Sequence, residues 1–177
     1  MVIVEDKGQK EGKHELKHKQ WDKLGVAYTR QPLPCGDYIA LNEKVQDVIS
    51  RKSKQKKDVK KMDLLGTHSI AVDTKKDILE IITNVVGKSH GRFRDELILA
   101  QNNGIKLFVL IENADGVTCI NDLYKWYNWR LKKSPKATTG RQLAKILTSM
   151  EYKYGVKFEF CKPEEAGLRV IELLGGE

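Results

Sequence analysis

The feature that most constrains the fold is a nearly continuous apolar run, Ile-Lys-Leu-Phe-Val-Leu-Ile, at residues 105–111. A strand of this composition is typically buried on both faces, as in the middle of an α/β sheet that helices cover. The remaining segments follow in mixed order, with strands and helices interspersed along the chain. We therefore expect an α/β fold in which helices flank a central mixed sheet.

Local patterns predict the individual elements. Short β-branched or alternating runs predict strands at 2–4, 26–30, 36–41, 69–72, 105–111 and 156–161. Helical spacing of apolar residues predicts helices at 14–24, 78–86, 92–102, 120–133, 142–154 and 164–174.

One stretch differs in composition from its surroundings. Residues 43–63 carry eight Lys or Arg against four acids, with almost no core-forming residue after Ile49. This composition predicts an inserted, mobile basic loop over about 43–68. We expect a single domain over 1–177, with a core at 1–113 that contains this insertion and a mostly helical C-terminal extension at 114–177.

Charge and cysteine content narrow the class of protein. The formal net charge is +8 and the sequence pI is near 9.3, which favours a polyanionic partner such as nucleic acid. The three cysteines form no CxxC pair, which argues against a disulfide framework and against a four-cysteine zinc site. No apolar run approaches the roughly 20 residues of a membrane span, and the N-terminus is charged too early for a signal peptide. The expectation is a soluble, cytoplasmic protein with no membrane partner.

Three of the predicted strands end at an acid. These acids are Glu5 or Asp6, then Asp37, then Asp73, and Lys75 follows Asp73 on the same side of its strand. Carboxylates hold Mg²⁺ or Mn²⁺, which polarises a phosphate and lowers the pKa of a bound water, while a nearby ammonium stabilises the transition state. The pattern predicts phosphodiester hydrolysis, in which Asp37 and Asp73 bind metal, Glu5 assists directly or through water, and Lys75 serves the attacking water.

The same motifs resemble a known family. Gly-Asp-Tyr at 36–38 and Asp-Thr-Lys at 73–75 resemble the GDY…(D/E)xK signature of the XPF-type nuclease domain, which belongs to the PD-(D/E)XK, or restriction-endonuclease-like, superfamily. Further similarities lie in the first strand, in the Arg-containing helix from Arg92 to Glu96, and in Leu-Phe-Val-Leu-Ile-Glu at 107–112. The resemblance covers residues 1 to about 113, and the tail is similar to that of phage or prophage proteins that carry this domain.

The resemblance implies a restriction-endonuclease-like fold and a DNA endonuclease that uses Mg²⁺ or Mn²⁺. It also implies branched or flap DNA as substrate, a place in repair or recombination, and a homodimer. The sequence also departs from the family pattern. The gap of 36 residues between Asp37 and Asp73 is long, and the basic insertion accounts for it. The third motif reads Asp-Thr-Lys where the family usually has Glu-Arg-Lys, which keeps an oxygen ligand and adds Thr74 to the metal-site candidates. The tail shows no Gly-hairpin pattern of a helix-hairpin-helix module, which argues against structure-selective cutting.

Other residues are candidates for contact with DNA. They lie in the helix after the first acidic strand, in the Arg-containing helix and in the basic stretch, and comprise Gln9, Lys13, His14, Arg92, Lys52, Lys54, Lys56 and Lys57. Trp126, Tyr127 and Trp129 either stack on bases or pack helices, and the sequence leaves both readings open.

Two alternative functions compete with the nuclease. His-Glu-Leu-Lys-His at 14–18 matches the HExxH pattern of a zinc protease, but its lysine-rich flanks oppose metal binding and no third ligand follows at a familiar spacing. A non-catalytic DNA-binding partner subunit with a nuclease-like fold is the other alternative, and the retained Asp37, Asp73 and Lys75 argue against it.

Overall fold

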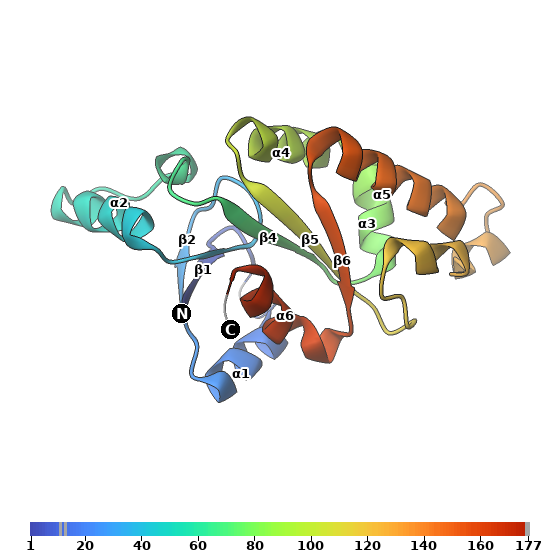
Figure 1. Cartoon of the computed structure of the whole chain (residues 1–177), viewed down its shortest axis with the longest axis horizontal. Coiled ribbons are helices and arrows are strands. Elements are labelled where there is room, and N and C mark those ends of the chain that lie inside the picture. Colours follow the sequence, from blue (N-terminus) through green and yellow to red (C-terminus); the bar gives the residue numbers. More distant parts are fainter. Residues whose placement is uncertain (11, 13, 176–177) are drawn as a thin grey trace.

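A six-stranded mixed sheet runs through the centre of the chain, as the prediction stated (Figure 1). The computed structural model describes residues 1–10, 12 and 14–175. The strands are β1 (Val2–Asp6), β2 (Ala27–Gln31), β3 (Tyr38–Ala40), β4 (Ile70–Lys75), β5 (Lys106–Glu112) and β6 (Lys157–Cys161). Their order is β2-β1-β3-β4-β5-β6, in which β3 is antiparallel to both of its neighbours and every other pair is parallel.

Helices cover both faces of this sheet (Figure 1). One face carries α3 (Ile78–Val85), α4 (His90–Asn102) and α5 (Gly140–Tyr154), and the other carries α1 (Glu15–Leu24) and α6 (Ala166–Leu173). Alternate residues of β5 enter the two cores: Val109 faces α3 to α5, and Leu110 faces α1 and α6. The apolar run of β5 therefore lies between two helical layers, as its composition predicted.

The loop predicted over about 43–68 is wrong for its first twelve residues, because residues 43–54 form helix α2 (Glu43–Lys54). Asn42 caps this helix by accepting a hydrogen bond from Val45 N at 3.0 Å. Val45 is fully buried, and Val48 and Ile49 pack beside it at helical spacing. A short 3₁₀ helix, η1 (Lys61–Leu64), follows. The lysines outnumber the apolar residues, but a narrow apolar stripe is enough to hold the helix on the core.

The C-terminal extension also differs from the prediction. The helix expected at 120–133 is two 3₁₀ helices, η2 (Ile120–Tyr124) and η3 (Trp129–Lys132). Asn128 interrupts it, because its side chain accepts from Arg130 N at 3.0 Å and donates to Thr138 O at 2.8 Å. The extension supplies the edge strand β6, a 3₁₀ turn η4 (Pro163–Glu165) and α6. Within the described residues, none of the helices has the length and apolar character needed to cross a membrane.

Gly140, the first residue of α5, lies in close contact with η2. A Cβ at this position would be 2.1 Å from Leu123 O and 2.6 Å from Trp126 O. We expect Gly140→Ala to lower the free energy of unfolding by about 3 kcal/mol, since neither backbone carbonyl can move without displacing a helix. Urea denaturation measures this. Gly91→Ala is the control, because a Cβ there meets no atom within 4 Å and should stabilise α4 by about 0.5–1 kcal/mol.

Candidate active site

Asp37 lies where three strands come together. Its backbone N donates to Val72 O of β4 at 2.8 Å, and its carbonyl accepts from Asp6 N at the end of β1 at 2.7 Å. Gly36, immediately before it, has a φ of +70°, and a Cβ there would lie 3.1 Å from Val72 O. Backbone geometry therefore requires glycine at position 36, because only glycine combines this φ with so close an approach.

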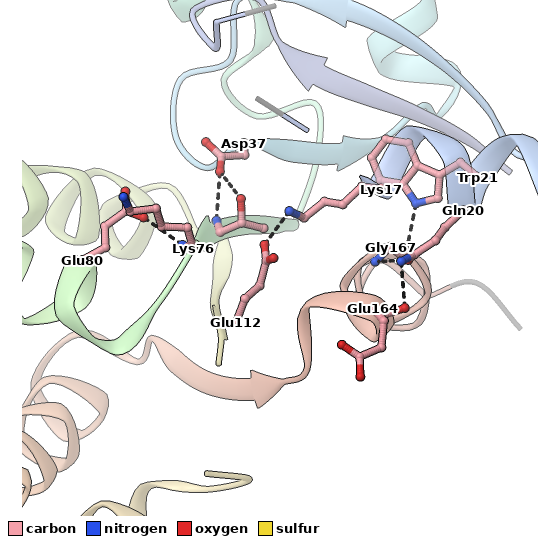
Figure 2. A network of polar contacts seen from close by, with 10 residues as sticks. Lys17, Gln20, Trp21, Asp37, Lys76, Glu80, Glu112, Glu164 and Gly167 are labelled. Carbon is pink, nitrogen blue, oxygen red and sulfur yellow. Dashed lines mark hydrogen bonds and ion pairs between the residues drawn. The ribbon is translucent and has the colours of Figure 1, made fainter. Parts of the chain in front are cut away.

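The carboxylate of Asp37 is held from two sides. Thr74 donates to its Oδ2 through both backbone N at 2.9 Å and Oγ1 at 2.6 Å, and the two dashed lines at Asp37 in Figure 2 mark these bonds. Gln9 donates to Oδ1 through Nε2. Thr74 points away from its neighbours Asp73 and Lys75, as strand alternation requires. Thr74 and Gln9 thus fix the orientation of Asp37.

Asp73 and Lys75 form a buried ion pair on the α3–α4 side of the sheet. Asp73 Oδ2 lies 2.5 Å from Lys75 Nζ, and this ammonium lies 5.4 Å from the centroid of the Phe93 ring. Both residues are buried. Their common face confirms the geometric prediction from the Asp-Thr-Lys spacing.

The negative charge of this region exceeds what one ammonium neutralises. Burial raises the pKa of Asp73; Lys75 opposes this shift, whereas the charges of Asp37 and Glu96 add to it. For Lys75, burial acts to lower the pKa, but Asp73 and Asp37 outweigh it and the pKa is raised. An additional cation near these carboxylates would be stabilised by the same charges.

These side chains open onto one cavity of about 660 Å³. Acidic, basic and amide groups from five segments line it, among them Asp6, Gln9, Asp37, Lys61, Asp73, Lys75, Arg92 and Glu96. The cavity therefore brings together six of the residues predicted from the sequence: Gln9, Asp37, Asp73, Thr74, Lys75 and Arg92.

Glu96 is a cavity residue that the sequence analysis did not nominate. It projects from α4, and its Oε1 accepts from Gly36 N at 2.8 Å, which ties α4 to the loop that carries Asp37. Its position one helical turn after Arg92, on the same face of α4, was the available signal.

Burial, together with the charges of Glu96 and Asp73, raises the pKa of Cys35 to about 12, so the Cys35 thiol stays protonated and is no nucleophile.

The first-strand acid at the cavity is Asp6, and the expectation for Glu5 is corrected. Glu5 points to the opposite face of the sheet, where its Oε2 lies 2.5 Å from His18 Nε2 and its Oε1 lies 3.3 Å from Arg30 Nε. Asp6 lines the cavity and accepts from Leu33 N at 2.9 Å. Alternation along β1 places adjacent acids on opposite faces, so only one of the two can face Asp73.

The helix with the HExxH pattern does not join the cavity. His14 packs edge-on against Tyr38, with 5.5 Å between ring centroids, and His18 pairs with Glu5. The two imidazoles therefore have different surroundings, which argues against a shared zinc ion and does not support His14 as a phosphate contact. Lys13 lies outside the described residues. Among the residues described, no three His, Cys, Asp or Glu side chains are grouped so as to hold a metal ion by themselves.

The basic segment contributes to the cavity at one point, Lys61. Lys52 is paired with Asp63 at 2.7 Å. Lys54, Lys56 and Lys57 are exposed beyond the cavity lining. Any contact of these three lysines with DNA would therefore lie outside the cavity.

Comparison with known proteins agrees with this geometry. A model of the ERCC4 domain matches residues 6–174, and so reaches well past residue 113 into the tail. No curated protein matches the chain. Among solved structures, XPF from Aeropyrum pernix is similar, with a TM-score of 0.58 and 13% identity over 97% of this chain and 64% of that one. The chain thus spans less than two thirds of that protein, and the likeness shows a common fold.

Proposed function

The chain belongs to the ERCC4 domain family of XPF-type nucleases, and from this premise we propose that it is a metal-dependent DNA endonuclease. The observation that carries the proposal is the convergence of Asp37, Asp73 and Lys75 in one cavity. Arg92 and Glu96 reach the same cavity from α4. Carboxylates, an ammonium and a guanidinium in one cavity are the groups that phosphodiester hydrolysis uses.

We propose that Mg²⁺ or Mn²⁺ is held by Asp37 and Asp73. Both are hard oxygen donors, and Mg²⁺ usually takes one or two protein carboxylates with water and phosphate oxygens as its other ligands. Burial is the main cause of the raised pKa of Asp73, and the charges of Asp37 and Glu96 add to it. A divalent ion would offset these neighbouring negative charges, which supports the fit. When bound, the ion would polarise the scissile phosphate and lower the pKa of a bound water.

The roles of the other residues that line the cavity follow from where their side chains lie. Lys75 Nζ, fixed between Asp73 and the face of Phe93, would orient the attacking water and stabilise negative charge on the phosphate. Arg92 would bind a non-bridging phosphate oxygen. Thr74 and Gln9 would act as positioning residues, because their hydrogen bonds hold the carboxylate of Asp37.

Branched or flap DNA is the substrate we propose to test first, since the family resemblance implies it, along with a role in repair. The homodimer is part of the same proposal, and light scattering tests it through the molar mass.

The function itself is tested by incubating the protein with branched, flap and linear DNA in Mg²⁺, Mn²⁺, Zn²⁺ or EDTA. Cleavage in Mg²⁺ or Mn²⁺ that EDTA stops supports the nuclease. Metal-independent DNA binding without cleavage under every condition favours the non-catalytic subunit.

Amide substitutions at the two adjacent acids of β1 are expected to differ, since one should lower the cleavage rate and the other the stability. Asp6→Asn should slow cleavage by about tenfold or more, because it removes a charge from the cavity but keeps the Oδ1 that accepts from Leu33 N. Glu5→Gln should leave the cleavage rate within about twofold and lower the free energy of unfolding by about 1–3 kcal/mol, since Arg30 and His18 lose the buried negative charge that faces them. Cleavage rates and urea denaturation on both variants measure this. The reverse pattern would restore Glu5 as the site acid.

A further inference from the structure

Three exposed aromatic residues lie within six positions of the chain, in the segment between β5 and α5. Tyr124, Tyr127 and Trp129 expose 52%, 58% and 51% of their surface. Several exposed aromatic side chains in one short segment are unusual, and exposed apolar groups of this kind commonly mark binding surfaces. This segment is therefore the strongest unexplained surface feature outside the cavity.

The same segment is strongly basic. Residues 123–150 contain seven Lys or Arg and no Asp or Glu. Arg130 and Lys133 each lie 5.9 Å from the centroid of the Trp129 ring. The nearest acids along the chain have partners within the protein, because Asp122 accepts from Thr118 and Asp115 accepts from Trp126 Nε1. The surface charge next to the aromatic rings is thus positive.

This surface is built on a fixed base. The side chain of Asn128 holds the turn before Trp129 from both ends, through Arg130 N and Thr138 O. Leu123 and Trp126 pack into the core under α3 to α5. The segment packs against α5, where the carbonyls of Leu123 and Trp126 lie close to Gly140. It therefore belongs to the same helical layer as α3 and α4, which line the cavity. Trp129 and Tyr127 are presented to solvent from a rigid frame.

The aromatic rings and the cations together indicate which kind of partner binds this surface. A second copy of the chain would bring like charges together, and an apolar peptide would have no anionic groups to pair with Lys and Arg. Unpaired bases have π-faces that stack on aromatic rings, and their backbone phosphates pair with Lys and Arg. Duplex DNA offers the phosphates but keeps its bases stacked on each other.

We propose that Tyr127, Trp129, Arg130 and Lys133, the aromatic–basic surface, bind single-stranded DNA. The rings stack on bases and the cations contact the backbone on either side. Binding here goes beyond the proposed cleavage function and does not require a metal ion. If the cavity cuts DNA, the aromatic–basic surface would hold an unpaired strand on the same side of the sheet.

The test is the affinity of the full-length chain for a fluorescently labelled single-stranded oligonucleotide and for the matching duplex, in EDTA so that nothing is cut. Trp129→Ala should weaken single-strand binding by about tenfold or more and duplex binding by much less. Trp129→Phe should stay within about threefold of the unchanged protein, because a ring remains. Tyr152→Ala is the matched control, since Tyr152 is 94% exposed on α5 outside the surface, and its affinity should not change.

Intrinsic fluorescence gives a second readout. The chain has three tryptophans. Trp21 is fully buried, and the indole Nε1 of Trp126 donates a hydrogen bond to Asp115. Oligonucleotide binding should quench the emission of Trp129, and Trp129→Phe should abolish most of this quenching while it keeps the affinity. Equal single-strand affinity of Trp129→Ala and the unchanged protein would overturn the proposal, as would equal losses on single strand and duplex. Neither result depends on whether the cavity cleaves DNA.

Discussion

Asp73→Asn is expected to slow metal-dependent DNA cleavage by at least about 10²- to 10³-fold. Asparagine fills the same space but is a weaker ligand without charge, so the proposed ion loses one of its two carboxylates. It also removes the negative charge that lies 2.5 Å from the ammonium of Lys75. DNA affinity in EDTA should be unchanged or higher, because a negative charge facing phosphate has been removed. Single-turnover cleavage and a binding titration separate the two effects.

The control for this variant is Asp22→Asn on the exposed side of α1. It makes the same chemical change away from the cavity and should alter neither rate nor affinity. If Asp73→Asn cut DNA within tenfold of the unchanged protein, Asp73 could not be a ligand of the catalytic ion. If it lost DNA binding and cleavage together, its role would be structural.

Lys17→Met is expected to lower the free energy of unfolding by about 3–5 kcal/mol. Lys17 of α1 crosses to the end of β5, where its Nζ lies 2.5 Å from Glu112 Oε1 (Figure 2). The two side chains are only 6% and 12% exposed. Methionine keeps the length of the side chain but leaves a buried carboxylate without a cation, and that uncompensated charge is the source of the loss. Urea denaturation gives the value.

A double variant isolates the ion pair. Lys17→Met with Glu112→Gln removes both charges and should recover at least half of the lost stability. Lys23→Met, an exposed lysine of the same helix, should change stability by less than about 0.5 kcal/mol. A loss below about 1 kcal/mol for Lys17→Met alone would mean that solvent or another group compensates Glu112.

The parts of the fold that follow from short-range patterns were predictable. The apolar run of β5 and the period of α3 and α4 depend on residues close in sequence, and the structure confirms them. Helix α2 was missed because its sequence is rich in lysine and its apolar stripe has only three residues. Such a helix is stable only when this stripe packs on a core, and strands distant in sequence build that core.

The candidate site shows the same limit. The spacing of Asp73 and Lys75 fixes their common face within one strand. Whether Glu5 or Asp6 joins them depends on which face of β1 meets α1, and this is set by tertiary contacts such as His18 with Glu5. Glu96 reaches the loop before Asp37 from 60 residues away in the chain. No local pattern encodes that contact.

The central claim is that the cavity holds a metal ion against the phosphate that is cut. Cleavage of DNA with one sulfur in place of a non-bridging phosphate oxygen tests it most directly, because Mg²⁺ binds sulfur poorly and the softer Mn²⁺ tolerates it. We predict that sulfur slows cleavage by about tenfold or more in Mg²⁺ and that Mn²⁺ restores most of the rate. An equal sulfur effect in both ions, or cleavage that continues in EDTA, would contradict a metal ion held by Asp37 and Asp73.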